Sequence, residues 1–289
     1  MCPTKFTEET GSKPLVSILI PAYNHAYFRE SLESALNQTY TNTEIIVCDD
    51  SGSYRIRKIV ASVIGAEGIK YRVNKRNLGA RKNYLKCFRL SKGHYIKYLN
   101  DDDVLAETCI QSMVDVLEQY PDVTLVSSRR RLIDGKGTTL PDAPFTRPAV
   151  ANDSIIPGLV AIQYMLGRKI NFIGEPTTAM FRRKDIGETL PDIMSFGGRP
   201  VMANLDVAMW LNLLSKGDLA YLIEVMSCFR IHGQQEQQKK DVRELCMSAW
   251  HQVTLDARRM GLLTPDNREV KPLLLQSSHQ SDNDRRMEV

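Results

Sequence analysis

The feature that most constrains the fold is a regular alternation of short apolar runs and amphipathic segments over roughly the first 130 residues. The apolar runs are rich in Val, Ile and Leu and have the length of buried strands, at 15–20, 44–48, 69–73, 95–99 and 123–126. Between them, segments such as 27–36 and 107–119 carry apolar residues at helical spacing. This alternation predicts βαβ units and an α/β fold with a mostly parallel sheet flanked by helices. Right-handed crossovers place the strand C-termini along one edge, where open α/β sheets bind ligands.

After residue 133 this rhythm changes, and a region rich in Pro and Asp runs to about residue 157. Beyond it the pattern predicts helices at 159–166, 206–215 and 240–259 and strands at 178–181 and 219–224. The tail, 264–289, is polar, and we expect it to be loosely held. We therefore divide the chain into a flexible N-terminus, an α/β half, a second half of the same domain and a helical extension with a polar tail, at 1–13, 14–133, 134–233 and 234–289.

Composition excludes several classes of protein. No apolar stretch approaches the ~20 residues that cross a bilayer. Residues 1–13 are polar and lack the apolar segment of a secretory signal. The six cysteines are scattered, with no C-x-x-C pair and no clustered histidines, which argues against a zinc site and a disulfide framework. We expect a cytoplasmic protein. Its net charge of +4 permits an anionic substrate or a membrane-surface partner without requiring either.

Acidic residues stand directly after two of the predicted strands. Asp50 follows one, and Asp101-Asp102-Asp103 follow another, so both sets fall on the ligand-binding edge. Three consecutive carboxylates repel one another unless a cation is present, and Mg²⁺ or Mn²⁺ takes such oxygen ligands together with a substrate's phosphates. The alternative is a solvated acidic turn in which Asp103 caps the following helix.

Two further segments at this edge have the chemistry of a nucleotide site. Pro21-Ala22-Tyr23-Asn24 follows the first strand, and its aromatic ring can flank a base. Asn77-Leu78-Gly79-Ala80-Arg81 opens a helix whose N-terminal amides and arginine can meet a phosphate or the base. The alternatives are a plain strand-to-helix turn and a surface helix start with a solvated arginine.

Five ordered blocks together resemble family 2 glycosyltransferases over about residues 15–130. The blocks are Ser17-Ile18-Leu19-Ile20-Pro21-Ala22-Tyr23-Asn24, Ser34-Ala35-Leu36-Asn37-Gln38-Thr39-Tyr40, Glu44-Ile45-Ile46-Val47-Cys48-Asp49-Asp50-Ser51-Gly52, Asn77-Leu78-Gly79-Ala80-Arg81-Lys82-Asn83 and Tyr98-Leu99-Asn100-Asp101-Asp102-Asp103. The resemblance implies a GT-A fold, in which a nucleotide-binding α/β half (14–133) is joined to an acceptor-binding half (134–233).

Carried over by position, the resemblance assigns roles to residues of the first half. It implies that the nucleotide sugar is bound by Pro21-Ala22-Tyr23-Asn24, with Ala22 and Tyr23 beside the base. It places Asp50 at the base or ribose and Arg81 near the base. Asp101 and Asp102 then serve the ribose and the metal-bound diphosphate.

The metal assignment departs from the family pattern. The family's motif is commonly Asp-x-Asp, but its first position here is Asn100. We expect Mn²⁺ or Mg²⁺ on Asp102 with Asp103 as the neighbouring ligand, and the choice among the three carboxylates stays open. The ending Phe229-Arg230-Ile231-His232 resembles the family's Tyr-Arg-x-His, which implies Arg230 on the diphosphate and His232 on the diphosphate or metal, against an ordinary structural histidine.

The second half carries weaker similarity. Gly174-Glu175-Pro176-Thr177-Thr178-Ala179-Met180-Phe181-Arg182-Arg183 is similar to a segment before the acceptor site of many members. The stretch 204–211 resembles the helix start that holds the catalytic base, which implies Asp206 as the base, with Leu205 where the family usually has Glu. The alternative for Asp206 is an ordinary acidic residue in the first turn of a helix.

The resemblance therefore implies an inverting transferase that moves a sugar from a nucleoside-diphosphate donor, UDP most commonly, to a saccharide or lipid-linked acceptor. Lipid-linked acceptors would suit peripheral contact with a membrane. Two rivals are a nucleotidyltransferase, for which the usual Gly-rich basic loop after the first strand is missing, and a degenerate nucleotide-binding module, which Asn100 and Leu205 keep open. Nucleic-acid binding has little support, because 129–131 is a short basic run without interleaved aromatics.

Overall fold

The first half of the chain alternates strands with helices, in agreement with the apolar pattern. The computed structural model describes residues 13–63, 65, 68–186, 193–233, 240–263 and 273–274. The strands of the first half are β1 (Val16–Ala22), β2 (Thr43–Asp49), β3 (Lys70–Val73), β4 (Tyr95–Tyr98), β5 (Val104–Leu105) and β6 (Val123–Ile133). Its helices are α1 (Phe28–Leu36), α2 (Tyr54–Ser62), α3 (Ala80–Leu90) and α4 (Cys109–Gln119).

The second half mixes short strands with helices. Its strands are β7 (Ser154–Ile156), β8 (Ala179–Arg182), β9 (Ser195–Phe196), β10 (Arg199–Pro200), β11 (Asp218–Arg230) and β12 (Leu273–Leu274). Its helices are α5 (Gly158–Arg168), the 3₁₀ turn η2 (Pro176–Thr178), α6 (Arg183–Ile186), α7 (Leu205–Leu214) and α8 (Lys240–Arg259). Apart from β12, the polar tail expected at 264–289 lies outside the described residues.

One sheet joins the two halves. In the described chain it has ten strands in the order β12-β7-β11-β6-β8-β4-β1-β2-β3, with β5 paired to β11. The neighbours β4, β1, β2 and β3 run parallel, as do β6 and β11, whereas β8 lies antiparallel between β6 and β4. The mainly parallel α/β architecture is confirmed. The sheet is continuous across residue 133, where the sequence suggested only a change of rhythm.

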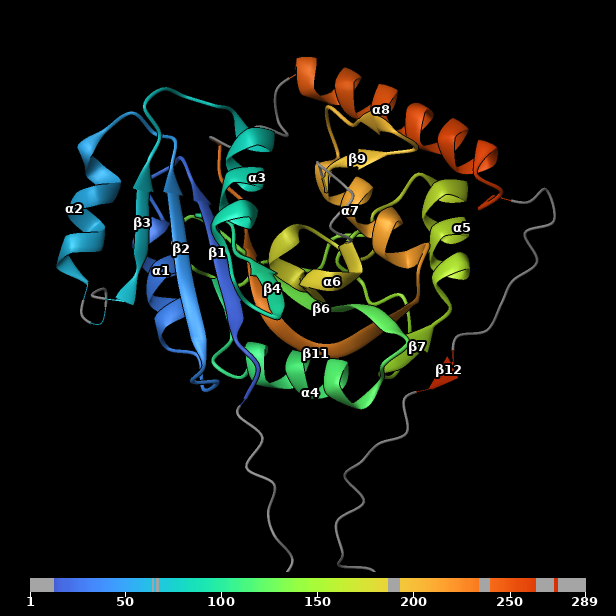
Figure 1. Ribbon diagram of the computed structural model, residues 1–289, viewed down its shortest axis with the longest axis horizontal. Helices are drawn as coiled ribbons and strands as arrows, with labels where there is room; N and C mark the ends of the chain where they lie inside the picture. Colours follow the sequence, from blue (N-terminus) through green and yellow to red (C-terminus); the bar gives the residue numbers. More distant parts are fainter. Residues whose placement is uncertain are drawn as a thin grey trace, which may run out of the picture.

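Helices cover both faces of this sheet (Figure 1). One apolar cluster joins the sheet to α3, α5, α7 and α8, and its centre is the fully buried Trp210 of α7. The other cluster joins the opposite face to α1, α2 and α4 through residues such as Phe28, Ile56 and Met113. This three-layer arrangement buries the alternate side chains of the central strands, which explains why their sequences read as continuous apolar runs. Within the described residues, none of the helices combines the length and apolar character that a bilayer crossing requires.

Three strands run further than the apolar pattern predicted. The first strand was expected to stop at Pro21, but β1 continues to Ala22. Proline is tolerated there because β4 pairs with β1 only as far as Leu19, so no ladder on that side needs an N–H from residue 21. The strands β6 and β11 extend to Ile133 and Arg230. Their polar residues continue the strands because the backbones of β6 and β11 pair with each other along the sheet.

Candidate active site

The acidic ends of β2 and β4 meet at the end of β1, which lies between them. The N–H of Asp50 donates to the carbonyl of Ala22 at 2.8 Å. On the other side, the N–H groups of Tyr23 and Asn24 donate to one carboxylate oxygen of Asp101, at 2.5 and 2.6 Å. The turn after β1 is therefore held by both acidic strand ends, and the predicted convergence of these two segments is confirmed.

Asp50 is a buried anchor for the loop that opens α3. It is 3% exposed, and its two oxygens accept hydrogen bonds from the N–H groups of Leu78 and Gly79 at 2.8–2.9 Å. The amide of Asn74 adds a further hydrogen bond at 2.6 Å. Gly79 has a φ of +78°, which an L-residue rarely adopts, and this conformation points its N–H toward Asp50. The direct ribose or base contact expected of Asp50 stays a prediction, and its visible contacts shape the surrounding loop.

The other residues expected at the nucleotide differ in exposure. Pro21 and Ala22 are buried inside β1, whereas the side chain of Tyr23 is 60% exposed beyond the strand end. Arg81 lies in the first turn of α3 and is partly exposed. Contact of Tyr23 or Arg81 with a base stays a prediction.

The three consecutive aspartates occupy three different environments. Asp101 caps the turn after β1, and burial together with the neighbouring Asp102 raises its pKa to about 7 despite the two N–H donors. The Asp102 side chain is 18% exposed and lies 3.0 Å from Nε2 of His232. Asp103 is fully buried, and burial raises its pKa well above the usual range.

Asp103 fixes the floor of the site. One of its oxygens accepts hydrogen bonds from Thr177 at 2.7 Å and Asn100 at 3.0 Å, and the other accepts the N–H of Arg230 at 3.2 Å. These contacts tie the loop after β4 to η2 and to the end of β11. The expected role of Asp103 as a metal ligand stays a prediction, which this buried and hydrogen-bonded arrangement does not favour.

Arg230 is also buried beneath the acidic loop. Its Nε donates to the carbonyl of Asp102 at 2.9 Å, and its terminal nitrogens contact the carbonyl of Asp134 and the carboxylate of Glu30. Its guanidinium lies 4.5 Å from the ring centroid of Tyr27. The side chain is 0% exposed, so its visible role is to position the loop, and contact with a diphosphate stays a prediction.

Asp102 and His232 are the pair at this edge suited to a hard metal ion. Among the described residues no group of three or more His, Cys, Asp or Glu side chains has the arrangement of a metal site. Mg²⁺-type ions need no such group, because they commonly bind one or two protein ligands and complete their shell with substrate phosphates and water. The carboxylate of Asp102 fits that incomplete donor set, and the imidazole of His232 would add a nitrogen ligand beside it.

Asp206 stands at the start of α7 on the other side of the site. Its two oxygens accept hydrogen bonds from Asn171 at 2.8 Å and from the N–H of Val207 at 2.9 Å. The residue before the helix, Asn204, has a φ of +52°, and the chain turns sharply there. Asp206 is partly exposed, and burial of its carboxyl group raises its pKa to about 6. It therefore has the accessibility and the proton affinity of a general base.

Glu175, a residue without a predicted role, interacts electrostatically with both Asp102 and Asp206. It pairs with Arg130 at 3.0 Å, and Gly174 makes room for this arginine, because a β-carbon there would lie 2.6 Å from the guanidinium. Burial raises the pKa of Glu175, and Asp102 contributes to the rise. The charge of Glu175 in turn raises the pKa of Asp206. In the sequence, Glu175 is a single acidic residue among apolar neighbours. Nothing there indicates that it pairs with Arg130, which lies 45 residues earlier.

Tyr84 of α3 contacts the acidic loop through Asn100. Its hydroxyl donates to the side-chain oxygen of Asn100, the residue that replaces the first aspartate of the family motif. Burial raises the pKa of the Tyr84 phenol well above its usual range, and the charges that add to the rise belong to Asp101, Asp102, Asp103 and Asp206. The two acidic groups are linked through the segment 171–177, because Asn171 donates to Asp206 at 2.8 Å and Thr177 donates to Asp103 at 2.7 Å.

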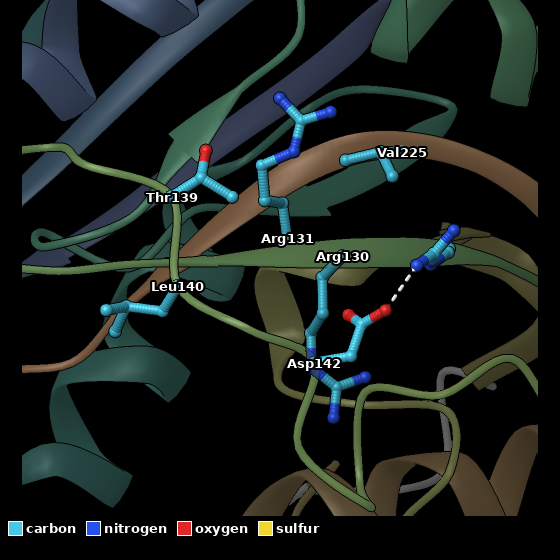
Figure 2. A pocket seen from close by; sticks show the side chains of 7 residues that line it. Arg130, Arg131, Thr139, Leu140, Asp142 and Val225 are labelled. Atoms are coloured by element: carbon cyan, nitrogen blue, oxygen red, sulfur yellow. Dashed lines mark hydrogen bonds and ion pairs between the residues drawn. The ribbon is translucent and has the colours of Figure 1, made fainter.

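A small cavity of about 150 Å³ lies beside β6, next to the arginine that holds Glu175. Figure 2 shows Arg130 and Arg131 leaving the strand on opposite sides, with Thr139, Leu140 and Asp142 from the following loop around them. Arg129 pairs with Asp142 at 2.5 Å. The basic run 129–131 is therefore divided among a buried ion pair, a loop contact and an exposed side chain, and it forms no continuous basic strip.

Comparison with known proteins gives a consistent result. Residues 17–190 match the model of glycosyl transferase family 2. An uncharacterised protein of Mycobacterium tuberculosis is 31% identical over 226 residues, which cover 76% of this chain and 68% of that protein. The Escherichia coli protein WfaP, a UDP-Glc:alpha-D-GlcNAc-diphosphoundecaprenol beta-1,3-glucosyltransferase, is 30% identical over 76% of this chain and 78% of its own length.

The fold is also found in a solved structure. The crystal structure of S. aureus TarS in complex with UDP-GlcNAc has a TM-score of 0.61 and 16% identity, over 80% of this chain and 64% of that one. This likeness shows the GT-A fold. In two further relatives the match covers only 23% and 33% of their length, so this chain corresponds to one part of those longer proteins.

Proposed function

Because this chain belongs to glycosyl transferase family 2, we propose that it moves a sugar from a nucleoside-diphosphate donor to an acceptor hydroxyl with inversion at the anomeric carbon. The observation that carries the proposal is the short segment 171–177, which contacts both acidic groups. Asn171 donates to Asp206, the expected base, at 2.8 Å, and Thr177 donates to Asp103 of the acidic loop expected to serve the donor at 2.7 Å. A single displacement needs the donor and the general base on opposite sides of one site.

The donor site is formed by the turn after β1 and the start of α3. Tyr23 and Arg81 border the base, and Asp50 keeps the backbone of Leu78 and Gly79 in place beside it. A uridine nucleotide is the favoured donor. The name of the E. coli relative specifies a UDP-glucose donor, and the TarS crystal structure contains UDP-GlcNAc, which supports this choice.

Asp102 and His232 would hold Mn²⁺ or Mg²⁺ together with the donor's diphosphate. When bound, the ion stabilises the negative charge that develops on the departing nucleoside diphosphate. Arg230 and Asp103 position Asp102 and His232, because they fix the backbone of the acidic loop and the end of β11. A third protein ligand is not required if the diphosphate supplies the remaining oxygens.

Asp206 removes the proton from the acceptor hydroxyl as this oxygen attacks the anomeric carbon. Its raised pKa lies close enough to neutral pH for the carboxylate to be both present and sufficiently basic. Asn171 orients the carboxylate through one oxygen, and the N–H of Val207 holds the other. The acceptor is a saccharide, free or lipid-linked. The diphosphoundecaprenol-linked acceptor in the relative's name supports the second form.

The direct test is a panel of nucleotide sugars with Mn²⁺, scored by the nucleoside diphosphate released with and without saccharide acceptors. We expect release from one UDP-sugar, with stimulation by an acceptor. Release of pyrophosphate from a nucleoside triphosphate plus a sugar phosphate would instead identify a nucleotidyltransferase. Nucleotide binding without turnover of any donor would identify a non-catalytic module.

The metal assignment has its own test in Asp102→Ala. Calorimetry with UDP in the presence of Mn²⁺ should show at least about tenfold weaker binding than the wild type, because a protein ligand of the ion is lost. Without the ion, the two proteins should bind UDP about equally. Equal affinity in both conditions would remove Asp102 from the metal site.

A further inference from the structure

Positive charge is concentrated in about one sixth of the chain. Residues 51–100 contain thirteen Lys and Arg but a single acidic residue, Glu67. The remaining residues contain 25 Lys and Arg against 33 Asp and Glu, so they carry a formal charge of −8. The modest net charge of the whole protein thus conceals a strongly basic segment within an acidic molecule.

The structure gathers much of this segment at one end of the sheet. Figure 1 shows α2 and the edge strand β3 at the left end of the molecule, whereas α3 packs on the opposite face of the sheet from α2. Six cations of α2, β3 and the loop after β3 are exposed: Arg55, Arg57, Lys58, Arg72, Lys75 and Arg76. We call this set the basic face.

Most of this charge is not compensated by nearby acids. Lys70, at the margin of the face, pairs with Glu44, and Arg55 contacts His25. No carboxylate of the described residues forms an ion pair with Arg57, Lys58, Arg72, Lys75, Arg76 or Lys82. Clustered like charges repel one another, and an anionic partner relieves that repulsion.

Protection of an edge strand explains only part of the pattern. Charged residues on an exposed edge prevent pairing with other strands, which accounts for Lys70 and Arg72 of β3. It does not account for the cations on α2 and α3, whose backbone hydrogen bonds are satisfied within the helices. A nucleic acid is also a poor partner, because Tyr54 is the one strongly exposed aromatic ring of the described residues in this segment.

A groove along α3 combines cations with apolar side chains. It has a volume of about 460 Å³ and is lined by Arg81, Lys82, Lys86 and Arg89 together with Leu78, Leu85 and Leu90. This groove lies on the opposite face of the sheet from α2, and its Arg81 belongs to the proposed donor site, so the groove is not part of the basic face. On the basic face itself, Tyr54 of α2 is 74% and Val73 of β3 51% exposed, and such side chains can enter the interfacial region of a bilayer.

We propose that the basic face docks on an anionic lipid bilayer. The attraction of each Lys or Arg near such a surface is about 1 kcal/mol, or roughly fivefold in binding. Several such residues act together here, so the protein can be held at the surface without a membrane-spanning segment. This inference concerns where the protein binds, and it stands or falls separately from the proposed sugar transfer.

The test is flotation of the whole protein with lipid vesicles, scored without any donor sugar. We expect binding to phosphatidylcholine vesicles that contain about 30% phosphatidylglycerol, little binding to phosphatidylcholine alone, and loss of binding in about 0.5 M salt. The variant Arg57→Glu/Lys58→Glu/Lys75→Glu should bind at least about 100-fold more weakly, because three attractive charges become repulsive.

The matched control is Lys136→Glu/Arg147→Glu/Arg258→Glu, which changes the net charge by the same amount at exposed positions elsewhere. It should retain most of the binding. Thermal unfolding and donor turnover without vesicles should be the same for both variants and the wild type, which separates this test from that of the enzyme. Equal losses in the two variants, no preference for anionic vesicles, or binding to single-stranded RNA in place of vesicles would overturn the proposal.

Discussion

Two aspartates, one in each half of the molecule, lie in opposite environments. Asp50, after β2, is 3% exposed and accepts hydrogen bonds from two backbone N–H groups and from Asn74. Asp206, at the start of α7, is partly exposed, and burial raises the pKa of its carboxyl group to about 6. The first carboxylate is well compensated and holds the loop that opens α3. The second is poorly compensated and retains affinity for a proton.

This difference suggests how to distinguish structural from reactive acids in the site. A carboxylate surrounded by hydrogen-bond donors fixes the backbone that carries those donors, which suits an anchor. A carboxylate with few donors in a partly buried place is a stronger base and is costly to keep charged. With Asp50 as an anchor and Asp206 as a base, substitution of Asp50 should mainly affect stability and donor binding. Substitution of Asp206 should mainly affect turnover.

The largest expected effect is that of Asp206→Asn on turnover. Loss of the general base should lower kcat by about 10²–10⁴-fold, with the donor Kd changed by no more than about threefold. Steady-state kinetics and calorimetry with UDP measure the two quantities. Asp218→Asn is a matched control, because this carboxylate also accepts a backbone N–H, from Gly158, but lies at the opposite end of β11 from the site. Normal turnover by Asp206→Asn would remove it from the mechanism.

The second-largest expected effect is that of Asp50→Asn on the stability of the protein. In Asp50→Asn one side-chain oxygen becomes an NH₂ group that faces a backbone donor, so charge-assisted hydrogen bonds to Leu78 and Gly79 are lost. We expect about 2–3 kcal/mol of lost stability in urea unfolding and weaker UDP binding, with a smaller effect on kcat. Asp115→Asn, on the exposed surface of α4, should change neither. A turnover defect as large as that of Asp206→Asn, with normal stability, would reverse the comparison.

The two halves also differ in how much of them the sequence could predict. Strands β1, β2 and β4 are buried on both faces, so their apolar runs were sufficient to locate them, and the acids after them could be assigned to one edge. In the second half, β6 and β11 continue through polar stretches such as Ser127–Arg131 because they pair with each other. No local pattern encodes such a long-range pairing.

The same limit applies to the site residues. The position of Asp206 followed from the family resemblance, but its neighbours did not. Glu175 forms an ion pair with Arg130, which lies 45 residues away in the chain. Asp103 accepts a hydrogen bond from Thr177, which lies 74 residues away. The resemblance also could not show that Arg230 is completely buried, because burial depends on Tyr27 and Glu30 from α1 and the turn before it.

A smaller effect concerns the pH dependence of the reaction. A general base works in its deprotonated form, so kcat/KM should rise with pH through about 6 and then reach a plateau. Below that value the rate should fall about tenfold per pH unit. The profile is best measured with saturating Mn²⁺ and a donor that does not titrate in the range. An acidic limb near pH 4 would mean that Asp206 is no less compensated than an ordinary surface carboxylate, and the contrast with Asp50 would lose its basis.

The smallest effect expected is a gain in stability from the same change that abolishes turnover. The folded-state pKa of Asp206 is raised above its usual value, so keeping it ionised destabilises the native state once the pH exceeds about 6. The full shift corresponds to about 3 kcal/mol, and partial exposure reduces this to about 1–2 kcal/mol. Asp206→Asn should therefore unfold about 2–4 °C higher than the wild type at pH 7.5. At pH 4 the wild-type carboxyl group is already neutral in the folded protein, so the gain should disappear. A variant less stable than the wild type at pH 7.5 would show that the carboxylate is anchored as firmly as Asp50, and the two halves of the site would then be alike.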